Sequence, residues 1–121
     1  MSYNVRLFNL YDWIEDDDIL NKIKSFIDVE KPDVINIQEF SSTESFLLKP
    51  YPYQHSSLSG GKTSYGLAIF SKFPIVNKGV VVSENSSAIA IFVDVIKDRD
   101  TLRFYNIHLQ CSWSLFKRRT R

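Results

Sequence analysis

Hydrophobic residues recur along this chain at two different spacings, and each spacing predicts a different kind of element. Alternation of apolar and polar residues over 3–8 predicts a first strand. The apolar stretch 34–38, entered through Pro32 and Asp33, predicts a buried strand. Between them lies a one-sided apolar stripe at helical spacing, formed by Ile19, Leu20, Ile23, Phe26 and Ile27. Strand, helix and strand within about 36 residues predict a βαβ unit.

The rest of the chain has the pattern of strands rather than helices. Ser41 and Glu44 stand at the spacing of a capping box and predict one short helix that ends at Leu48. Extended segments are predicted at 51–55, 67–70, 80–82, 88–96 and 101–109. The polar residues 97–100 predict a hairpin between the last two. The predicted fold class is therefore α/β (α+β), one strand-rich sheet with flanking helices in a single domain over 1–121.

Charge and cysteine content exclude several classes of function. The chain has 15 Lys and Arg against 14 Asp and Glu, a net charge of +1, so no broad field attracts nucleic acid or membranes. The basic cluster in 117–121 is interpreted as a solvated tail, with binding of a phosphate backbone as the alternative. A single cysteine, Cys111, excludes an internal disulfide, and two histidines exclude a histidine-rich metal cage. Without a long apolar run or a signal-peptide pattern, we expect a soluble and by default cytoplasmic chain.

The segment 32–40 carries the clearest candidate for a functional group. Its apolar strand ends in Gln38 and Glu39, and strands of α/β layers commonly carry functional groups at their carboxyl ends. A half-buried carboxylate is costly unless a counter-ion neutralises it. Carboxylate and water ligands suit magnesium, so Glu39 is a candidate ligand of a hard divalent cation. The alternative is a strand that simply ends in solvent.

His108 ends the last predicted strand, where alternation places it on one face with Phe104 and Asn106. It is a candidate site residue, and the alternative is a hydrogen-bonded structural histidine. Asn4 poses the same choice, because an amide within a sheet can bond a neighbouring backbone group. His55 has no polar companion in the sequence and is interpreted as a surface residue.

Four segments carry a recognisable series of motifs. Residues 2–6 form a first-strand motif, and residues 32–39, PDVINIQE, have the pattern D-x-x-x-x-Q-E. Residues 65–75, YGLAIFSKFPI, are similar to G-x-A-I-x-S-R-x-P-I, and residues 104–109, FYNIHL, are similar to a strand that contains N-T-H-L. In this order the four motifs resemble those of the endonuclease/exonuclease/phosphatase superfamily of DNase I-like phosphodiesterases.

The resemblance implies a DNase I-like four-layer αββα sandwich, of which this chain holds about half, and a magnesium-dependent phosphoester hydrolase. It implies that Glu39 is the carboxylate ligand of the catalytic Mg²⁺, with Mn²⁺ as a substitute. Asn4 is implied to lie beside it and to orient the metal shell or the phosphate, and His108 to hydrogen-bond a phosphate oxygen. Water would attack the phosphorus of a phosphodiester or phosphomonoester in a nucleic acid, a phospholipid head group or a small ester.

Two later motifs of the superfamily are missing here, which predicts the front part of a domain. Neither a G-D-x-N strand nor a terminal S-D-H is present, and residues 109–121 contain no Asp, Glu or His. We expect little or no activity from this chain alone, and the alternative function is a catalytically inactive remnant that acts only as a folded or interaction module. Residues 88–96 are apolar on both strand faces, and the helix at 19–27 is expected to cover only one of them. Self-association, or pairing with a missing C-terminal half, is therefore expected.

Overall fold

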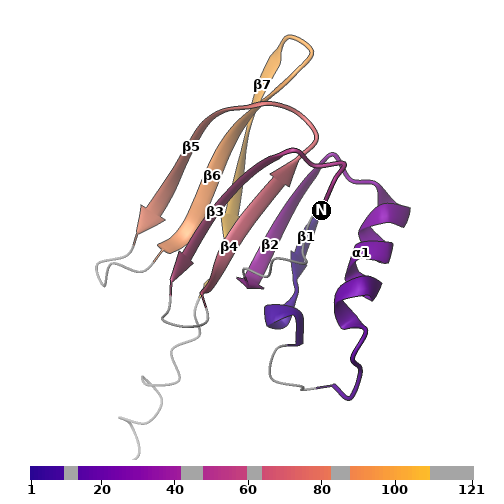
Figure 1. Ribbon diagram of the computed structural model, residues 1–121. Coiled ribbons are helices and arrows are strands. Elements are labelled where there is room, and N and C mark those ends of the chain that lie inside the picture. Colours follow the sequence, from indigo (N-terminus) through magenta and orange to yellow (C-terminus); the bar gives the residue numbers. More distant parts are fainter. Residues whose placement is uncertain (10–13, 42–47, 60–63, 83–87, 110–121) are drawn as a thin grey trace, which may run out of the picture.

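The computed structural model of the protein describes residues 1–9, 14–41, 48–59, 64–82 and 88–109 (Figure 1). The described elements are β1 (Ser2–Asn4), η1 (Arg6–Asn9), α1 (Ile19–Glu30), β2 (Val34–Ser41), β3 (Tyr53–Ser59), β4 (Tyr65–Ser71), β5 (Ile75–Val82), β6 (Ala88–Lys97) and β7 (Asp100–Ile107). The short helix predicted to follow Ser41 and the basic tail over 117–121 lie outside these residues. No helix in the described ranges is long and apolar enough to cross a bilayer.

The strands form two sheets, and α1 packs against the first of them (Figure 1). The first sheet has the order β1-β2-β4-β3, with β1 parallel to β2 and the other pairs antiparallel. The second is an antiparallel meander, β5-β6-β7. The mixed α+β class is confirmed, but the prediction of a single sheet was wrong. The chain changes sheet just after β4, where the Ser71 hydroxyl both accepts from the Phe73 N–H and donates to the Phe73 carbonyl, at 3.0 and 2.9 Å, ahead of Pro74.

Alternation along β2 and β4 divides the apolar side chains between two cores. Ile35 and Ile37 face α1 and pack with Ile23 and Ile27. The opposite faces of the two sheets meet in a second core, formed by Val34, Leu67, Ile69, Ile91, Val93 and Val95. The expectation that the helix covers one face of the strand 88–96 was therefore wrong. The inner face of β6 is covered by the first sheet, while α1 covers the other side of that sheet.

The first strand is shorter than predicted because the backbone turns after Asn4. The Asn4 side-chain oxygen accepts the Arg6 N–H at 3.0 Å, which closes an Asx-type turn. Arg6, Leu7 and Phe8 then have left-handed backbones, with φ of 47°, 55° and 54°. The turn still contributes apolar surface, because Val5 is buried in the core under α1 and Phe8 packs at the border of that core.

The predicted helix is confirmed as α1, and local contacts define both of its ends. Lys31 has φ 47°, and its N–H donates to the Ile27 carbonyl at 2.8 Å, which closes the C-terminus. At the other end, Asp16 accepts the Asp18 N–H at 2.9 Å and pairs with Lys22. The hydrogen bond from Lys22 lowers the pKa of Asp16.

The second sheet carries the predicted hairpin and a charged cluster on its outer face. Lys97 pairs with Asp100 across a two-residue turn, in which Asp98 has φ 57°. On the outer face, Arg103 donates two hydrogen bonds to Asp94, at 2.7 and 2.8 Å, and these lower the pKa of that carboxyl group. The same guanidinium lies 4.3 Å from the centre of the Phe92 ring.

His55 is not the surface residue that the sequence suggested. It lies half-buried on β3, where its Nε2 is 3.2 Å from the Gly79 carbonyl oxygen of β5. A carbonyl can only accept, so this ring nitrogen carries the hydrogen. The bond joins the outermost strands of the two sheets.

At Gly66 of β4, the backbone of the neighbouring strand β3 leaves no room for a side chain. A Cβ at Gly66 would lie 2.0 Å from the Ser57 backbone oxygen, so Gly66→Ala must push the two strands apart. We expect a loss of about 1–3 kcal/mol in the free energy of unfolding, measured by chemical denaturation. Gly79→Ala is the matched control with a smaller expected loss, because its Cβ would meet the ring of Phe92 at 2.4 Å and that ring can rotate. Unchanged stability of Gly66→Ala would contradict the description of this pairing.

Candidate functional site

A bulge in β2 turns the side chain of Glu39 away from the core under α1. Ile35 and Ile37 point toward α1, and regular alternation would send Glu39 the same way. Instead, the regular pairing of β2 with β4 is interrupted between Ile37 and Phe40, and Glu39 has a left-handed backbone with φ 51°. Phe40 therefore takes the place in the α1 core, and the carboxylate of Glu39 is directed toward the end of β7.

Asn4 and His108 converge on this carboxylate. Asn4, the last residue of β1, donates from Nδ2 to Oε1 of Glu39 at 3.1 Å across 35 positions of sequence. His108 directly follows β7, and its Nε2 lies 3.7 Å from the same oxygen. That distance is too long for a hydrogen bond but allows an ion pair when the imidazole is protonated. The structure thus brings together the three residues that the sequence singled out.

The oxygen ligands at Glu39 suit a hard cation that takes most of its other ligands from water and substrate rather than from the protein. The side chains of Glu39 and His108 are 32% and 37% exposed, so water and a ligand can reach them. The described residues contain no group of three or more His, Cys, Asp or Glu that would form a closed cage. Mg²⁺ is usually held by one or two carboxylates together with waters and substrate phosphates. A single accessible carboxylate fits that pattern.

Asn106 and Gln38 join the two sheets next to the candidate site. Asn106 is 1% exposed, and its Nδ2 donates to the carbonyl oxygens of Ile37 and Ala68, at 2.8 and 2.9 Å. Its Oδ1 accepts from Nε2 of Gln38 at 2.7 Å, and that nitrogen also donates to the Ser2 hydroxyl at 3.0 Å. We call Asn106 and Gln38 the inter-sheet clamp. The sequence placed Asn106 on one strand face with His108, as a polar pair that could serve a site, but it predicted no contact between Asn106 and Gln38.

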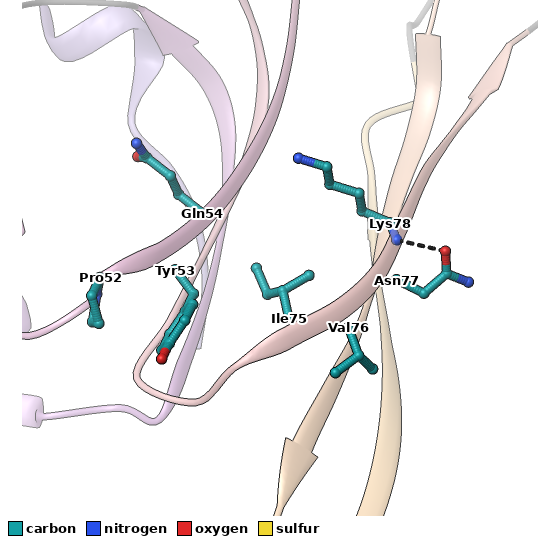
Figure 2. Close-up of a pocket in the computed structure, with 7 residues that line it drawn as sticks. All are labelled: Pro52, Tyr53, Gln54, Ile75, Val76, Asn77 and Lys78. Atoms are coloured by element: carbon teal, nitrogen blue, oxygen red, sulfur yellow. Dashed lines mark hydrogen bonds between the residues drawn. The ribbon is translucent and has the colours of Figure 1, made fainter.

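Two pockets lie at opposite edges of the first sheet. One of about 450 Å³ lies between β1 and α1, and its lining includes Asn4, Arg6 and the apolar residues Tyr3, Ile14, Ile19 and Phe26. The other, of about 460 Å³, lies where the edge strands β3 and β5 begin, and its lining includes none of the three candidate residues (Figure 2). In Figure 2, Lys78 extends from β5 into the space between those strands, while Asn77 points away from it. The first pocket is therefore the one that adjoins the candidate site.

Solved structures share this fold across almost the whole chain. An endonuclease/exonuclease/phosphatase family protein from Leptotrichia buccalis C-1013-b aligns with 99% of it, at a TM-score of 0.62 and 14% identity. Humanized D. rerio TDP2 aligns with 96%, at 0.73 and 16% identity. The 3′ phosphatase NExo from Neisseria, bound to a product DNA hairpin, aligns with 88%, at 0.55 and 19% identity. The chain spans 62%, 48% and 39% of these three chains.

The sequence comparison gives the same assignment. No protein with a curated description matches the sequence. Residues 1–118, however, match the endonuclease/exonuclease/phosphatase family as a whole. This match covers nearly all of the sequence, and the two sheets agree with solved structures that bear the same family name. The chain therefore belongs to the endonuclease/exonuclease/phosphatase family.

Proposed function

We propose that this chain supplies the carboxylate part of the active site of a phosphoester hydrolase. The observation that carries the proposal is the backbone of Glu39. A non-glycine residue with a left-handed φ of 51° costs of order 1–3 kcal/mol, and such strain persists where the surroundings hold it in place. Here the strained residue carries a carboxylate that is directed at Asn4 and His108. A strand end with a purely structural role would not need this backbone strain.

The proposed metal ligand is Glu39, with Mg²⁺, or Mn²⁺ in its place, as the cofactor. When bound, the cation would act as a Lewis acid on the phosphate and activate the attacking water. Asn4 fixes the orientation of the carboxylate through its bond to Oε1, because its own side-chain oxygen is held by the Arg6 N–H. These two hydrogen bonds therefore keep the proposed ligand in one position before anything binds.

His108 is the proposed donor to the phosphate. Hydrolysis forms a bond between a water oxygen and phosphorus and breaks the bond to the leaving oxygen, so negative charge builds on the phosphate oxygens. A ring N–H directed at such an oxygen stabilises that charge. The gap of 3.7 Å between Nε2 and Oε1 of Glu39 leaves the ring nitrogen close to the carboxylate without a direct hydrogen bond that would occupy it.

The proposed substrate is a phosphate ester of nucleic acid, and smaller phosphate esters are the other candidates. A solved structure of similar fold is a 3′ phosphatase bound to its product DNA hairpin. The near-neutral charge of the chain, +1, is consistent with recognition of one phosphate group rather than of a long backbone.

Exchanging Glu39 for Gln tests the metal site directly. We expect Glu39→Gln to weaken Mg²⁺ and Mn²⁺ binding at least about tenfold, measured by calorimetry, because the neutral amide loses the charge that attracts the ion. Any magnesium-dependent hydrolysis of a 3′-phosphorylated DNA oligonucleotide should disappear with it. Glu30→Gln is the matched control, since it removes the same charge from an exposed position at the end of α1. Equal metal affinity of the two variants would exclude Glu39 as a ligand.

Exchanging Glu39 for Gly distinguishes the effect of backbone strain on stability from the effect of the carboxylate on metal binding. Glycine adopts a φ near 51° without steric cost, so Glu39→Gly should raise the free energy of unfolding by about 1 kcal/mol while abolishing metal binding. Thermal and urea denaturation measure the first effect, and calorimetry the second. A variant that is less stable than wild type would argue against backbone strain at this residue.

Self-association through the outer face of the second sheet is also proposed. Tyr105 and Ile107 of β7 are 49% and 54% exposed, and Val81 of β5 is 39% exposed. Exposed apolar side chains that follow one another across a sheet mark interaction surfaces. Size-exclusion chromatography with light scattering should show a concentration-dependent increase in mass that Ile107→Lys reduces. Lys24→Ala, on the helix, is the control with no expected change, and a wild-type mass that stays monomeric at high concentration would refute the proposal.

A further inference from the structure

We propose that Asn106 is a positioning residue of the candidate site, resting on the function proposed for Glu39 and His108. Its carboxamide makes three hydrogen bonds inside the protein, of 2.7, 2.8 and 2.9 Å, and leaves only 1% of the residue exposed. Replacing a buried amide with this many partners should destabilise the fold, because each lost bond leaves a buried polar group without a hydrogen-bond partner. The role follows from where the partners lie.

The carbonyl oxygens that accept from Asn106 belong to the strand pair at the edge of the bulge. Ile37 and Ala68 face each other as the last regular pair of β2 and β4 before the interruption that contains Glu39. Asn106 bonds both of their carbonyls from the second sheet. The bulge that redirects Glu39 is therefore anchored on one side by a side chain of β7.

The third partner of Asn106 precedes the candidate metal ligand. Gln38 donates to Oδ1 of Asn106 and is the residue immediately before Glu39. His108 directly follows β7 and lies two positions after Asn106 in the sequence. The clamp thus fixes β2 and β7 one and two residues away from the two groups whose separation is 3.7 Å.

A second bond supports the same strand but cannot replace the clamp. Asn36 donates from Nδ2 to the Tyr105 carbonyl at 2.8 Å. It lies farther along β2 from Glu39 than Gln38 does, and it holds the backbone of β7 rather than the bulge. Apolar contacts in the second core stabilise the packing of the two sheets but do not fix their alignment, because the hydrophobic effect does not depend on orientation. The Asn106 carboxamide, in contrast, bonds both strands of the pair that borders the bulge.

The experiment compares Asn106→Asp with a core control in the full 121-residue chain. Aspartate keeps the size of the side chain but replaces the donating nitrogen with an oxygen that faces two carbonyl oxygens. The readout is the nuclear Overhauser effect between the His108 ring protons and the Glu39 side-chain protons, recorded without metal. We expect this signal in wild type and at least a fivefold loss of its intensity in Asn106→Asp. Val93→Ala should keep the wild-type intensity, because it perturbs the same layer between the sheets without changing the clamp residues.

Two results would overturn the inference. One is a wild-type signal in folded Asn106→Asp, and the other is an equal loss in Val93→Ala, which would show that any damage to the layer moves the site. If Asn106→Asp does not fold, Gln38→Ala takes its place, because it removes one clamp bond and keeps the two backbone bonds of Asn106. Its signal should fall at least twofold, and an unchanged signal would refute the role.

Titration with Mn²⁺ separates this inference from the proposed function. We expect about tenfold weaker Mn²⁺ binding in Asn106→Asp, the size of effect typical when a group that orients a ligand is lost. If wild type binds no Mn²⁺ but the proton signals change as expected, the positioning role stands and the metal proposal fails. If Mn²⁺ binding depends on Glu39 but not on Asn106, the metal proposal stands and the positioning role fails.

Discussion

The carboxamide of Asn106, buried between the two sheets, is the contact on which the arrangement of this protein depends. Val34, Leu67, Ile69 and their partners on β6 make the sheets adhere, but apolar packing tolerates small slides of one sheet over another. Hydrogen bonds do not, because their energy falls steeply with distance and angle. Three such bonds from one side chain fix how β7 lies over β2 and β4. The bond from Asn36 to the Tyr105 carbonyl joins the same two sheets farther from Glu39.

The bulge at Glu39 is the second constraint, and it acts within one strand. A strand that alternates regularly can present a residue only to the face that its position dictates. By inserting one extra residue, β2 keeps Ile37 and Phe40 in the same core and releases Glu39 to the other side. The cost of a left-handed glutamate is offset by the packing of Phe40 and by the bond from Asn4. Packing and site geometry are therefore satisfied by the same irregularity.

Much of the fold could be predicted because it depends on local pattern. The stripe from Ile19 to Ile27 identified α1, and the polar residues 97–100 identified a hairpin. The division into two sheets could not be predicted, since it depends on a three-residue turn at Ser71 whose hydroxyl bonds are not encoded by periodicity. The early end of β1 and the contact of His55 with Gly79 had the same origin, namely side-chain bonds to backbone groups. Glu39, Asn4 and His108 could be singled out through motifs, and the resemblance implied that Asn4 lies beside Glu39, but the bulge that directs Glu39 toward them departs from the alternation that the sequence predicts.

The two sheets differ in how much chain must be closed into loops before their strands can pair. The meander β5-β6-β7 joins neighbours in sequence, and its last turn has two residues. The bond between Gln38 and Asn106 spans 68 positions, and that between Asn4 and Glu39 spans 35. The entropy lost on closing a loop grows with its length, so contacts of this range are made at a higher conformational cost than those of the meander. The candidate site thus depends on contacts between distant parts of the sequence, and its three residues come together only once the two sheets have docked, because Glu39 and Asn4 belong to the first sheet and His108 follows the last strand of the second.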